Sequence, residues 1–549
     1  MIISFEQTPE DFYRLSLAAL EKGELEKALN YCEKAINGKG SNEYKMTLAD
    51  IFLRMGRYFD AMDVAIEVLC AGGEEKGDAY DVLSRATGAT GKVYESIYYI
   101  TKKARLEGDE AALDAMDEMM EEMSSFMESS APQDRFFVVG QEPKKDYAAQ
   151  LDRAVQLMHT GAYEKALALA SEVEESSSYY ADARDIALKC YVKMGDTDSA
   201  LCTAKEQVAR DPKDAFALYV LVGICKKREY LSLLEEADGE ASDLYYAVAA
   251  ANAEKEYPLA EKLAARLLAK ARYSPEAYFV AAGVAHNARD HKKRDALLKD
   301  LFSLYKKYPA NLILDGLKKK RSYDVMFGGL MPETILSVLR DYVRKHAHTS
   351  DAFLRSMLTD GEFRRALLLL FQADDEEVVG NAVSFYGQED HRELDRFFDG
   401  LLLRPSVSPM TKREILAERL LKKHKGGLTV VPTTIPMRVS CKKPEHYELY
   451  PDKLQDAYVD ALSFGVCVMD LKLTKELSSY MEKCFRAFSV IRRYSEAELT
   501  VALICLIMPD PGVPFPEDMC AYVTSQIFGL GKRAALRVRR LMEVIKALD

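Results

Sequence analysis

Histidine and cysteine side chains are the first place to look for chemistry in this sequence, because they bind metals and act as nucleophiles or bases. His346 and His348 form the one close histidine pair. Residues two apart on a helix point to different faces, and no acidic residue or cysteine lies at ligand spacing, so we expect surface histidines and no metal site. Cys441 or Cys467 with His446 could form a nucleophile pair in principle. No third group is indicated beside them, and we expect no catalytic cysteine.

Motifs of phosphate-binding and hydrolytic enzymes are absent: G-x-x-x-x-G-K-[ST], H-E-x-x-H and G-x-S-x-G do not occur. Gly328-Gly329 and Gly426-Gly427 are isolated pairs that fit turns. The acidic run Asp374–Glu377 lacks the alternating ligands of a calcium loop and is typical of a solvated helix start. We therefore expect a protein that is not an enzyme and that holds neither a cofactor nor a metal.

Basic residues near the end of the chain indicate a second kind of chemistry, contact with phosphate. Two helices joined at Phe528–Gly531 have the outline of a helix-turn-helix, whose second helix would enter a major groove while its cations meet phosphate. The alternative is an amphipathic terminal helix that docks its apolar residues and leaves its arginines solvated. The five cations concerned are Lys532, Arg533, Arg537, Arg539 and Arg540.

The net charge of −12 is unevenly divided along the 549 residues. Residues 410–549 carry a balance of +5, which leaves −17 for residues 1–409. Phosphate repels an acidic surface, so the larger part of the chain is a poor general binder of nucleic acid.

The expected compartment is the cytoplasm. Residues 1–10 carry Glu6 and Glu10 and lack the basic start and apolar core of a signal peptide, and no apolar run approaches the ~20 residues of a membrane span. The ten cysteines form no C-x-x-C pair, and most stand at apolar helical positions, which is typical of buried thiols in a reducing environment.

The elements that would position any site are shown by a recurring hexad. Gly161–Ala166 lies between two helical runs, and its glycine permits the φ > 0 turn that ends the first of them. The first glycines of the series are 33 and 35 residues apart, the next gap is 70 and the one after it 34. A fixed period in the thirties predicts an array of helical hairpins that bury their apolar faces only against their neighbours. The other copies are Gly23–Ala28, Gly56–Ala61, Gly91–Ser96, Gly195–Ala200 and Gly361–Ala366.

This pattern resembles the tetratricopeptide repeat (TPR) over about residues 9–309: small residues at repeat positions 8, 20 and 27, glycine at 15 and proline near 32. The sequence departs from the family in having no tryptophan. Lys255 and Arg289 replace the turn glycine in later units. The resemblance implies a scaffold whose first helices line a concave groove for a peptide or helix of a partner protein.

Transferring the family's groove positions 5 and 9 to this chain gives the expected partner-binding residues. Tyr13 and Leu17 stand where the family's Lys/Asn clamp for C-terminal carboxylates would be, so binding of chaperone tails is disfavoured. The full set is Tyr13, Leu17, Met46, Asp50, Asp81, Arg85, Asp185, Lys189, Tyr219, Tyr245 and Phe279.

The remaining segments continue the helical pattern with two interruptions. Methionines 116, 119, 120, 123 and 127 form a stripe that either packs on the third repeat or offers a soft docking surface. Leu428–Val431 and Met437–Cys441 are short and β-branched and predict a hairpin or extended clasp. The expected divisions are repeats at 1–108, a Met-rich helix and loop at 109–146, further repeats at 147–309, degenerate helical pairs at 310–425, and a hairpin with a helical domain at 426–549.

Together these observations predict an all-α chain: a right-handed TPR-like helical solenoid continued by degenerate pairs, with a short β-hairpin and a C-terminal helical domain. The expected function is a non-enzymatic protein-protein interaction scaffold. The alternative is a TPR-type regulator whose C-terminal basic helices bind nucleic acid. An enzyme hidden in residues 426–549 is a third, less favoured reading, because no catalytic motif marks it.

Overall fold

The computed structural model describes residues 8–38, 40–128, 133–135, 144–159, 161–237, 239–422, 427–440, 443–444, 446–468, 474–507, 520, 523–524 and 528–547. Within these ranges the side chains of 120–128, 133–135, 144–146, 159, 440, 474–475 and 532 are not described. The chain forms two compact units. Residues 8–113 with 339–547 make the first unit, and residues 114–338 make the second. The finer division into five segments stays a prediction.

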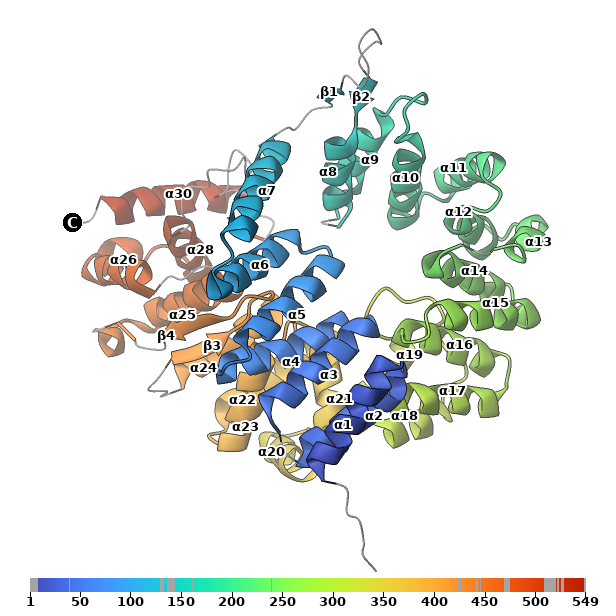
Figure 1. The fold of residues 1–549 in the computed structure, drawn as a ribbon. Helices are drawn as coiled ribbons and strands as arrows, with labels where there is room; N and C mark the ends of the chain where they lie inside the picture. The colour runs from blue at the N-terminus through green and yellow to red at the C-terminus, as the bar shows by residue number, and fades with distance from the viewer. Residues whose placement is uncertain are drawn as a thin grey trace, which may run out of the picture. The chain divides into compact units, whose positions relative to one another are not determined.

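The first unit begins with three helical pairs (Figure 1). Their small apolar residues recur at helical spacing and face the neighbouring helix: Ala28, Cys32 and Ala35 are fully buried. The N-terminus of the first helix is capped by Thr8, whose hydroxyl accepts from the Asp11 amide at 3.2 Å. The helices are α1 (Pro9–Glu21), α2 (Leu25–Gly38), α3 (Asn42–Arg54), α4 (Tyr58–Ala71), α5 (Lys76–Ala89) and α6 (Val93–Glu107).

The hexad turns explain why these helices stop where they do. Five of the six hexad glycines, Gly161 among them, lie at φ between 71° and 79°, a conformation that costs other residues about 1 kcal/mol or more. Lys255 and Arg289 adopt the same conformation, at φ 62° and 67°, so the repeat geometry is kept where the glycine is lost. The sixth hexad was misread: Gly361 is the first residue of a helix, because Asp360 caps that helix by accepting from the amides of Glu362 and Phe363.

The second unit continues the helical pairs. In Figure 1 the first helices α10, α12, α14 and α16 follow one another on one side, and the second helices α11, α15 and α17 lie on the other. One pair is irregular, since its first helix passes into a π-helix at Val220–Ile224 and its second is short. The helices are α8 (Ala148–His159), α9 (Tyr163–Ser171), α10 (Tyr180–Met194), α11 (Thr197–Arg210), α12 (Ala215–Tyr219), α13 (Leu231–Leu234), α14 (Ala241–Ala253), α15 (Tyr257–Lys270), α16 (Pro275–Asn287), α17 (His291–Leu304) and α18 (Ala310–Leu317).

Residues 109–146 were expected to be a methionine-striped helix followed by a loop. The helix α7 spans Glu110–Glu128, and in the segment that was expected to be a loop β1 (Gln133–Arg135) pairs antiparallel with β2 (Lys144–Asp146). Met116 is half-buried and Met119 is exposed. The side chains of Met120, Met123 and Met127 lie outside the described residues, as does the segment 136–139.

The rest of the first unit is helical, as expected, around one short hairpin. Strand β3 (Gly427–Val430) pairs antiparallel with β4 (Met437–Ser440), and the predicted end of the second strand, Cys441, lies outside the described residues. The turn between the strands is held from two helices. Tyr99 Oη donates to Thr434 O at 2.7 Å, and Lys412 Nζ donates to Val431 O at 2.6 Å.

The remaining helices of this unit are α19 (Glu333–His346), which crosses the boundary, α20 (Ser350–Thr359), α21 (Gly361–Gln372), α22 (Glu376–Gln388), α23 (Arg392–Leu402), α24 (Pro409–Leu421), α25 (Asp452–Cys467), α26 (Thr474–Arg486), α27 (Phe488–Ile491), α28 (Glu496–Ile507) and α30 (Lys532–Lys546). Ser495 and Glu498 form a capping box at the start of α28, with Ser495 N to Glu498 Oε2 at 2.7 Å and Glu498 N to Ser495 Oγ at 3.2 Å. Among the described helices, none combines the length and the apolar character that crossing a membrane requires.

Candidate binding groove

A groove of about 800 Å³ opens in the second unit between the N-terminal parts of α10, α12 and α14. It contains Asp185 and Lys189, two of the residues expected from the repeat positions. Its floor and walls combine aromatic rings with carboxylates. The lining residues are Glu175, Tyr180, Ala181, Asp182, Arg184, Asp185, Lys189, Gln207, Arg210, Asp211, Lys213, Asp214, Ala215, Phe216, Ser242, Asp243 and Tyr246.

Aromatic rings from two neighbouring first helices, Phe216 and Tyr246, meet in the lining of the groove. The Phe216 ring lies edge-on to Tyr246, with centroids 4.9 Å apart, and stacks on Tyr219 at 6.3 Å. Lys189 Nζ lies 5.7 Å from the centroid of Phe216 and forms an ion pair with Asp185 at 2.5 Å. A cation of the chain itself is therefore already in contact with the aromatic surface.

Acidic side chains outnumber basic ones around this cluster. The lining holds six carboxylates and four cations. Arg210 pairs with Glu175, and Arg184 pairs with Glu206 outside the lining. Asp214 caps α12 by accepting from Ala217 N at 2.9 Å, and burial raises the pKa of its carboxyl above the ordinary value.

Two buried polar atoms in the groove wall have no hydrogen-bond partner. Gln207 is 8% exposed, and while its Nε2 donates to Asp214 at 3.2 Å, its Oε1 accepts nothing. Arg184 Nε donates to nothing. An unsatisfied buried acceptor and donor each cost about 1–3 kcal/mol, so the wall would gain from a ligand that carries both an N–H and a carbonyl.

The neighbouring part of the first-helix face is covered by the chain itself. Residues 322–327, which follow α18 and which we call the strap, alternate between exposed and covered positions: Tyr323 and Val325 are buried, Asp324 and Met326 are exposed. This alternation is that of an extended strand. A Cβ placed on Gly283 of α16 would lie 2.6 Å from the Tyr323 ring, so the strap runs directly against this helix.

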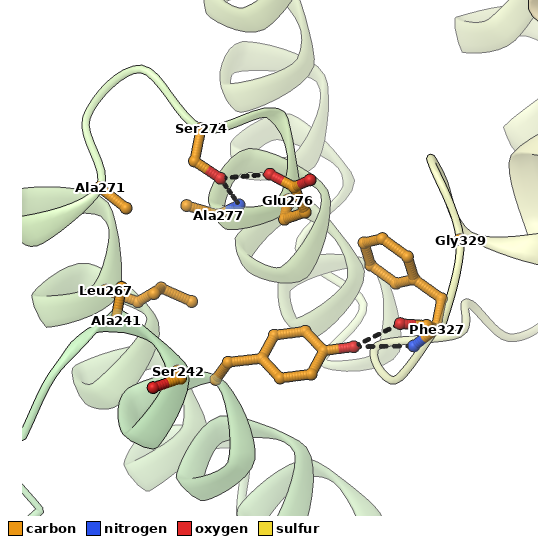
Figure 2. A pocket seen from close by; sticks show the side chains of 10 residues that line it. Ala241, Ser242, Leu267, Ala271, Ser274, Glu276, Ala277, Phe327 and Gly329 are labelled. Carbon is orange, nitrogen blue, oxygen red and sulfur yellow. Dashed lines mark hydrogen bonds between the residues drawn. The ribbon is translucent and has the colours of Figure 1, made fainter. Parts of the chain in front are cut away.

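Side chains of the first helices hold the strap by its backbone. Asn287 Nδ2 donates to Tyr323 O, and Tyr323 N donates to Asn287 Oδ1, both at 2.9 Å. Tyr245 Oη donates to Phe327 O at 2.9 Å and accepts from Phe327 N at 2.8 Å. Figure 2 shows the second pair of bonds at Phe327. Bonds to backbone groups read the extended conformation of a segment and not its side chains.

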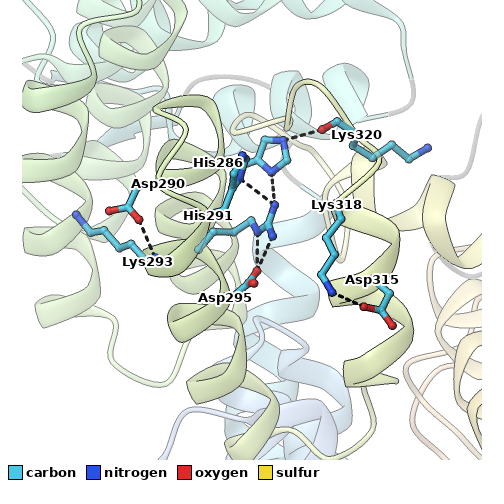
Figure 3. A network of polar contacts seen from close by, with 9 residues as sticks. His286, Asp290, His291, Lys293, Asp295, Asp315, Lys318 and Lys320 are labelled. Atoms are coloured by element: carbon cyan, nitrogen blue, oxygen red, sulfur yellow. Dashed lines mark hydrogen bonds and ion pairs between the residues drawn. The ribbon is translucent and has the colours of Figure 1, made fainter.

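A buried cation and a histidine hold the segment just before the strap. Arg294 is 1% exposed and donates through Nη1 to Nδ1 of His286 at 2.9 Å, while its Nη2 pairs with Asp295 at 2.6 Å. Because the guanidinium can only donate, the His286 proton sits on Nε2, which donates to Lys320 O at 3.2 Å (Figure 3). Burial and the Arg294 charge lower the pKa of His286 to about 4.

A smaller pocket of about 250 Å³ lies where the strap ends (Figure 2). Phe327 and Gly329 form one side, and the ends of α14, α15 and α16 form the others, with Leu267 and Ala277 among the apolar residues. Ser242 lines both this pocket and the larger groove, so the two spaces lie on either side of the start of α14.

The expected partner-binding residues of the second unit divide into three groups. Asp185 and Lys189 line the open groove. Tyr219 is not among the lining residues and stacks on Phe216, and Tyr245 is occupied by the strap. Phe279 is fully buried, with Tyr308 at 5.6 Å and Phe327 at 6.4 Å, so it is packing and not a free contact surface.

Most of the expected residues of the first unit are buried or in contact with other side chains of that unit. Tyr13 stacks on Tyr44 at 4.2 Å, and Met46 is buried, whereas Leu17 is exposed. Arg85 joins two of the carboxylates, lying 3.3 Å from Asp50 and 3.6 Å from Asp81. Asp50, Asp81 and Arg85 are therefore paired with one another, and the role of all six residues in binding stays a prediction.

Four residues that matter at this site were not among those expected. Asn287 and Gly283 stand on the same helix as Phe279, and Phe216 and Tyr246 carry the aromatic wall. Phe216 occupies repeat position 2, beside the positions 5 and 9 that were transferred, so a wider set of first-helix positions would have included it. The strap itself has no repeat signature.

The histidine, cysteine and basic residues that the sequence offered as reactive or phosphate-binding groups make other contacts in the structure. His346 Nδ1 contacts Tyr342 O at 2.8 Å, and Cys467 is buried, with a thiol pKa that burial raises to about 12. No group of three metal-binding side chains occurs among the described residues. In α30, Arg537 pairs with the buried carboxylate of Glu498 at 2.6 Å, whereas the docked-helix alternative left this arginine solvated. The Lys532 side chain lies outside the described residues, and nucleic-acid binding through Arg533, Arg539 and Arg540 stays a prediction.

Comparisons with known proteins give structures but no sequence relatives. No protein-family model and no curated protein matches the chain. Similar solved structures include the TPR2AB domain of yeast Sti1 in complex with pHSP90 (12% identity, 56% of this chain and 96% of that chain, TM-score 0.19). Others are a tetratricopeptide repeat protein from Parabacteroides merdae (13%, 48% and 93%, 0.22) and the TPR domain of P58(IPK) (12%, 76% and 99%, 0.17). TM-scores this low do not fix an overall superposition, and the TPR-like architecture rests on the helical pairs and turns of this chain.

Proposed function

We propose that this chain is a non-enzymatic protein-interaction scaffold, and that the groove between α10, α12 and α14 binds an extended segment of a partner protein. The observation that carries the proposal is the strap. The same row of first helices holds an extended segment of the chain itself through Asn287 and Tyr245, while the groove next to it is open. An extended ligand that continues along this face would meet helices of the same kind.

The unpaired atoms in the groove wall support a peptide in particular. Gln207 Oε1 lacks a donor and Arg184 Nε lacks an acceptor. A peptide backbone offers both groups once per residue, so it could satisfy the two atoms together.

The proposal includes a reducing compartment, for which the cytoplasm is the simplest assignment. The nine cysteines in the described residues are all free, and burial raises the thiol pKa of Cys32 and Cys484 to about 12. Such thiols are protonated at neutral pH and resist oxidation.

A selection experiment tests the proposal. A phage library of twelve-residue peptides is panned against the full chain, and enriched peptides are synthesised with a fluorophore for anisotropy titrations. The selected peptides should bind at least ten-fold more weakly to Phe216→Ala and Tyr246→Ala, and unchanged to Phe59→Ala, an exposed aromatic of α4 in the other unit. Enrichment of no peptide, or equal binding to all variants, would contradict a peptide-binding groove here.

A further inference from the structure

The open groove combines two surfaces that attract the same kind of ligand group. Aromatic faces attract cations through their quadrupole, and carboxylates attract them through charge. Here the Phe216 and Tyr246 rings, 4.9 Å apart, are bordered by Asp182 and Asp243 on the two flanking first helices. The strap-bound part of the face differs, because it receives Tyr323, Val325 and Phe327.

One cation of the chain already uses part of this surface. Lys189 Nζ lies 5.7 Å from the Phe216 centroid and pairs with Asp185. Carboxylates remain in excess after this pairing. The lining holds six acidic and four basic side chains, and one of the basic ones, Arg184, pairs with a residue outside the lining.

A second observation, independent of the charges, indicates which atoms the ligand presents. Gln207 is more than nine-tenths buried in the groove wall, and its Oε1 accepts no hydrogen bond. The ligand group that satisfies this oxygen must be a hydrogen-bond donor, an N–H or an O–H. A guanidinium supplies several such donors on a planar cation that also stacks on aromatic rings.

We infer that the partner segment is cationic, and that it places an arginine, or less effectively a lysine, against Phe216 and Tyr246 with its charge toward Asp182 and Asp243. The inference rests on the proposed peptide-binding function and names the class of partner: an extended, Arg-rich and solvent-exposed segment. It also separates the two halves of the face, one apolar and filled by the strap, the other acidic and open.

Three labelled octapeptides test this inference with the full chain: alternating Arg and Ser, alternating Gln and Ser, and alternating Glu and Ser. The Arg peptide should bind at least ten-fold more tightly than the Gln peptide, with the Glu peptide weakest. Raising the salt concentration from about 50 to 300 mM should weaken the Arg peptide, because screening shortens the reach of the carboxylates.

The variant Asp182→Asn/Asp243→Asn removes two charges and keeps one oxygen in each side chain, so it should abolish the preference for the Arg peptide. The matched control is Asp198→Asn/Asp300→Asn, which makes the same charge change on the second helices α11 and α17, where both residues are exposed. Lys189→Met, which removes the internal cation, should tighten binding of the Arg peptide. Circular dichroism of each variant verifies that the helices are intact.

The outcomes separate this inference from the proposed function. If the Gln or Glu peptide binds as tightly as the Arg peptide, or if the groove variant and its control behave alike, the cationic class is wrong. The same holds if the peptides selected from the phage library bind at Phe216 and contain no excess of Arg or Lys. If neither selected nor designed peptides depend on Phe216, the proposed function fails with it.

Discussion

Asn287 and Tyr323 exchange two hydrogen bonds of 2.9 Å, one through each side of the Asn287 amide. The pairing matches a side chain on a helix to the backbone of an extended segment 36 residues away. It is the clearest sign that the first helices of the second unit can hold a chain in extended conformation.

Asn287→Ala should loosen the strap, because both backbone groups of Tyr323 lose their partner. The expected cost is about 1–3 kcal/mol in the free energy of unfolding. Limited digestion with trypsin should cut faster at the four consecutive basic residues 318–321 that precede the strap. Asn311→Ala, at an exposed position of α18, is the control and should leave the digestion rate unchanged. Equal rates for the two variants would contradict the role of Asn287.

Gly283→Ala should lower stability, because the new Cβ would lie 2.6 Å from the Tyr323 ring and 3.1 Å from Val325. Overpacking of this kind costs about 1–3 kcal/mol. Gly380→Ala is the matched change within α22, where nothing lies within 4 Å of the added atom, and it should raise stability by about 1 kcal/mol. Urea unfolding of the two variants measures both values, and the same sign for both would refute this account of Gly283.

The stability of the second unit should fall as the pH is lowered below about 6.5. The pKa of His286 is lowered from 6.5 to about 4 in the folded chain, so between these values the unfolded chain binds a proton that the folded chain does not. The linked loss is about 2 kcal/mol by pH 5. Since carboxylates also titrate in this range, the measurement is the difference in urea unfolding between pH 7 and pH 5 for wild type and His286→Gln. The variant should show the smaller difference, and an equal or larger one would show that His286 is not the group responsible.

Tyr99→Phe should destabilise the first unit while keeping its packing. The ring contacts with Tyr80 and Tyr98 remain, but Thr434 O loses the donor that lies 2.7 Å away in a buried site. A loss of about 1–3 kcal/mol is expected. Tyr31→Phe, at a half-buried position of α2, should cost much less. Thermal unfolding with matched heating rates compares the two, and similar shifts in Tm would argue against the hydrogen bond as the cause.

Arg537→Ala should lower the Tm of the chain, whereas Arg540→Ala should not. Arg537 is paired with Glu498, whose side chain is 7% exposed, and its removal leaves a buried carboxylate without its cation.

A gel-shift titration with duplex DNA at low salt, carried out on Arg533→Ala/Arg540→Ala, then tests the nucleic-acid prediction separately from stability. If the wild type shifts the DNA in the gel and this variant does not, while its Tm is unchanged, the result would favour the regulator alternative.

Most of the architecture could be predicted because a solenoid is encoded locally. The period of the hexads and the small residues opposite them each act within one or two helices, and both were confirmed. Gly361 was misread because a helix-capping aspartate directly precedes it, and capping overrides the turn preference of glycine.

The site was less predictable, because it depends on contacts between distant segments. Asp185 and Lys189 follow from repeat position alone, but the burial of Phe279 depends on a strap more than 40 residues further along the chain. Residues 322–327 alternate like many short extended segments, and nothing in their types shows that they return to α14 and α16. The closure of one part of the groove is a tertiary property.

The central claim is that the first-helix face of the second unit binds an extended partner segment in its open groove. Amide hydrogen exchange of the full chain, with and without a saturating phage-selected peptide, tests it most directly. The account predicts slower exchange in residues 180–189, 215–219 and 241–246, with α11, α15 and α17 unchanged. Protection confined to those second helices, with the groove residues unaffected, would contradict it.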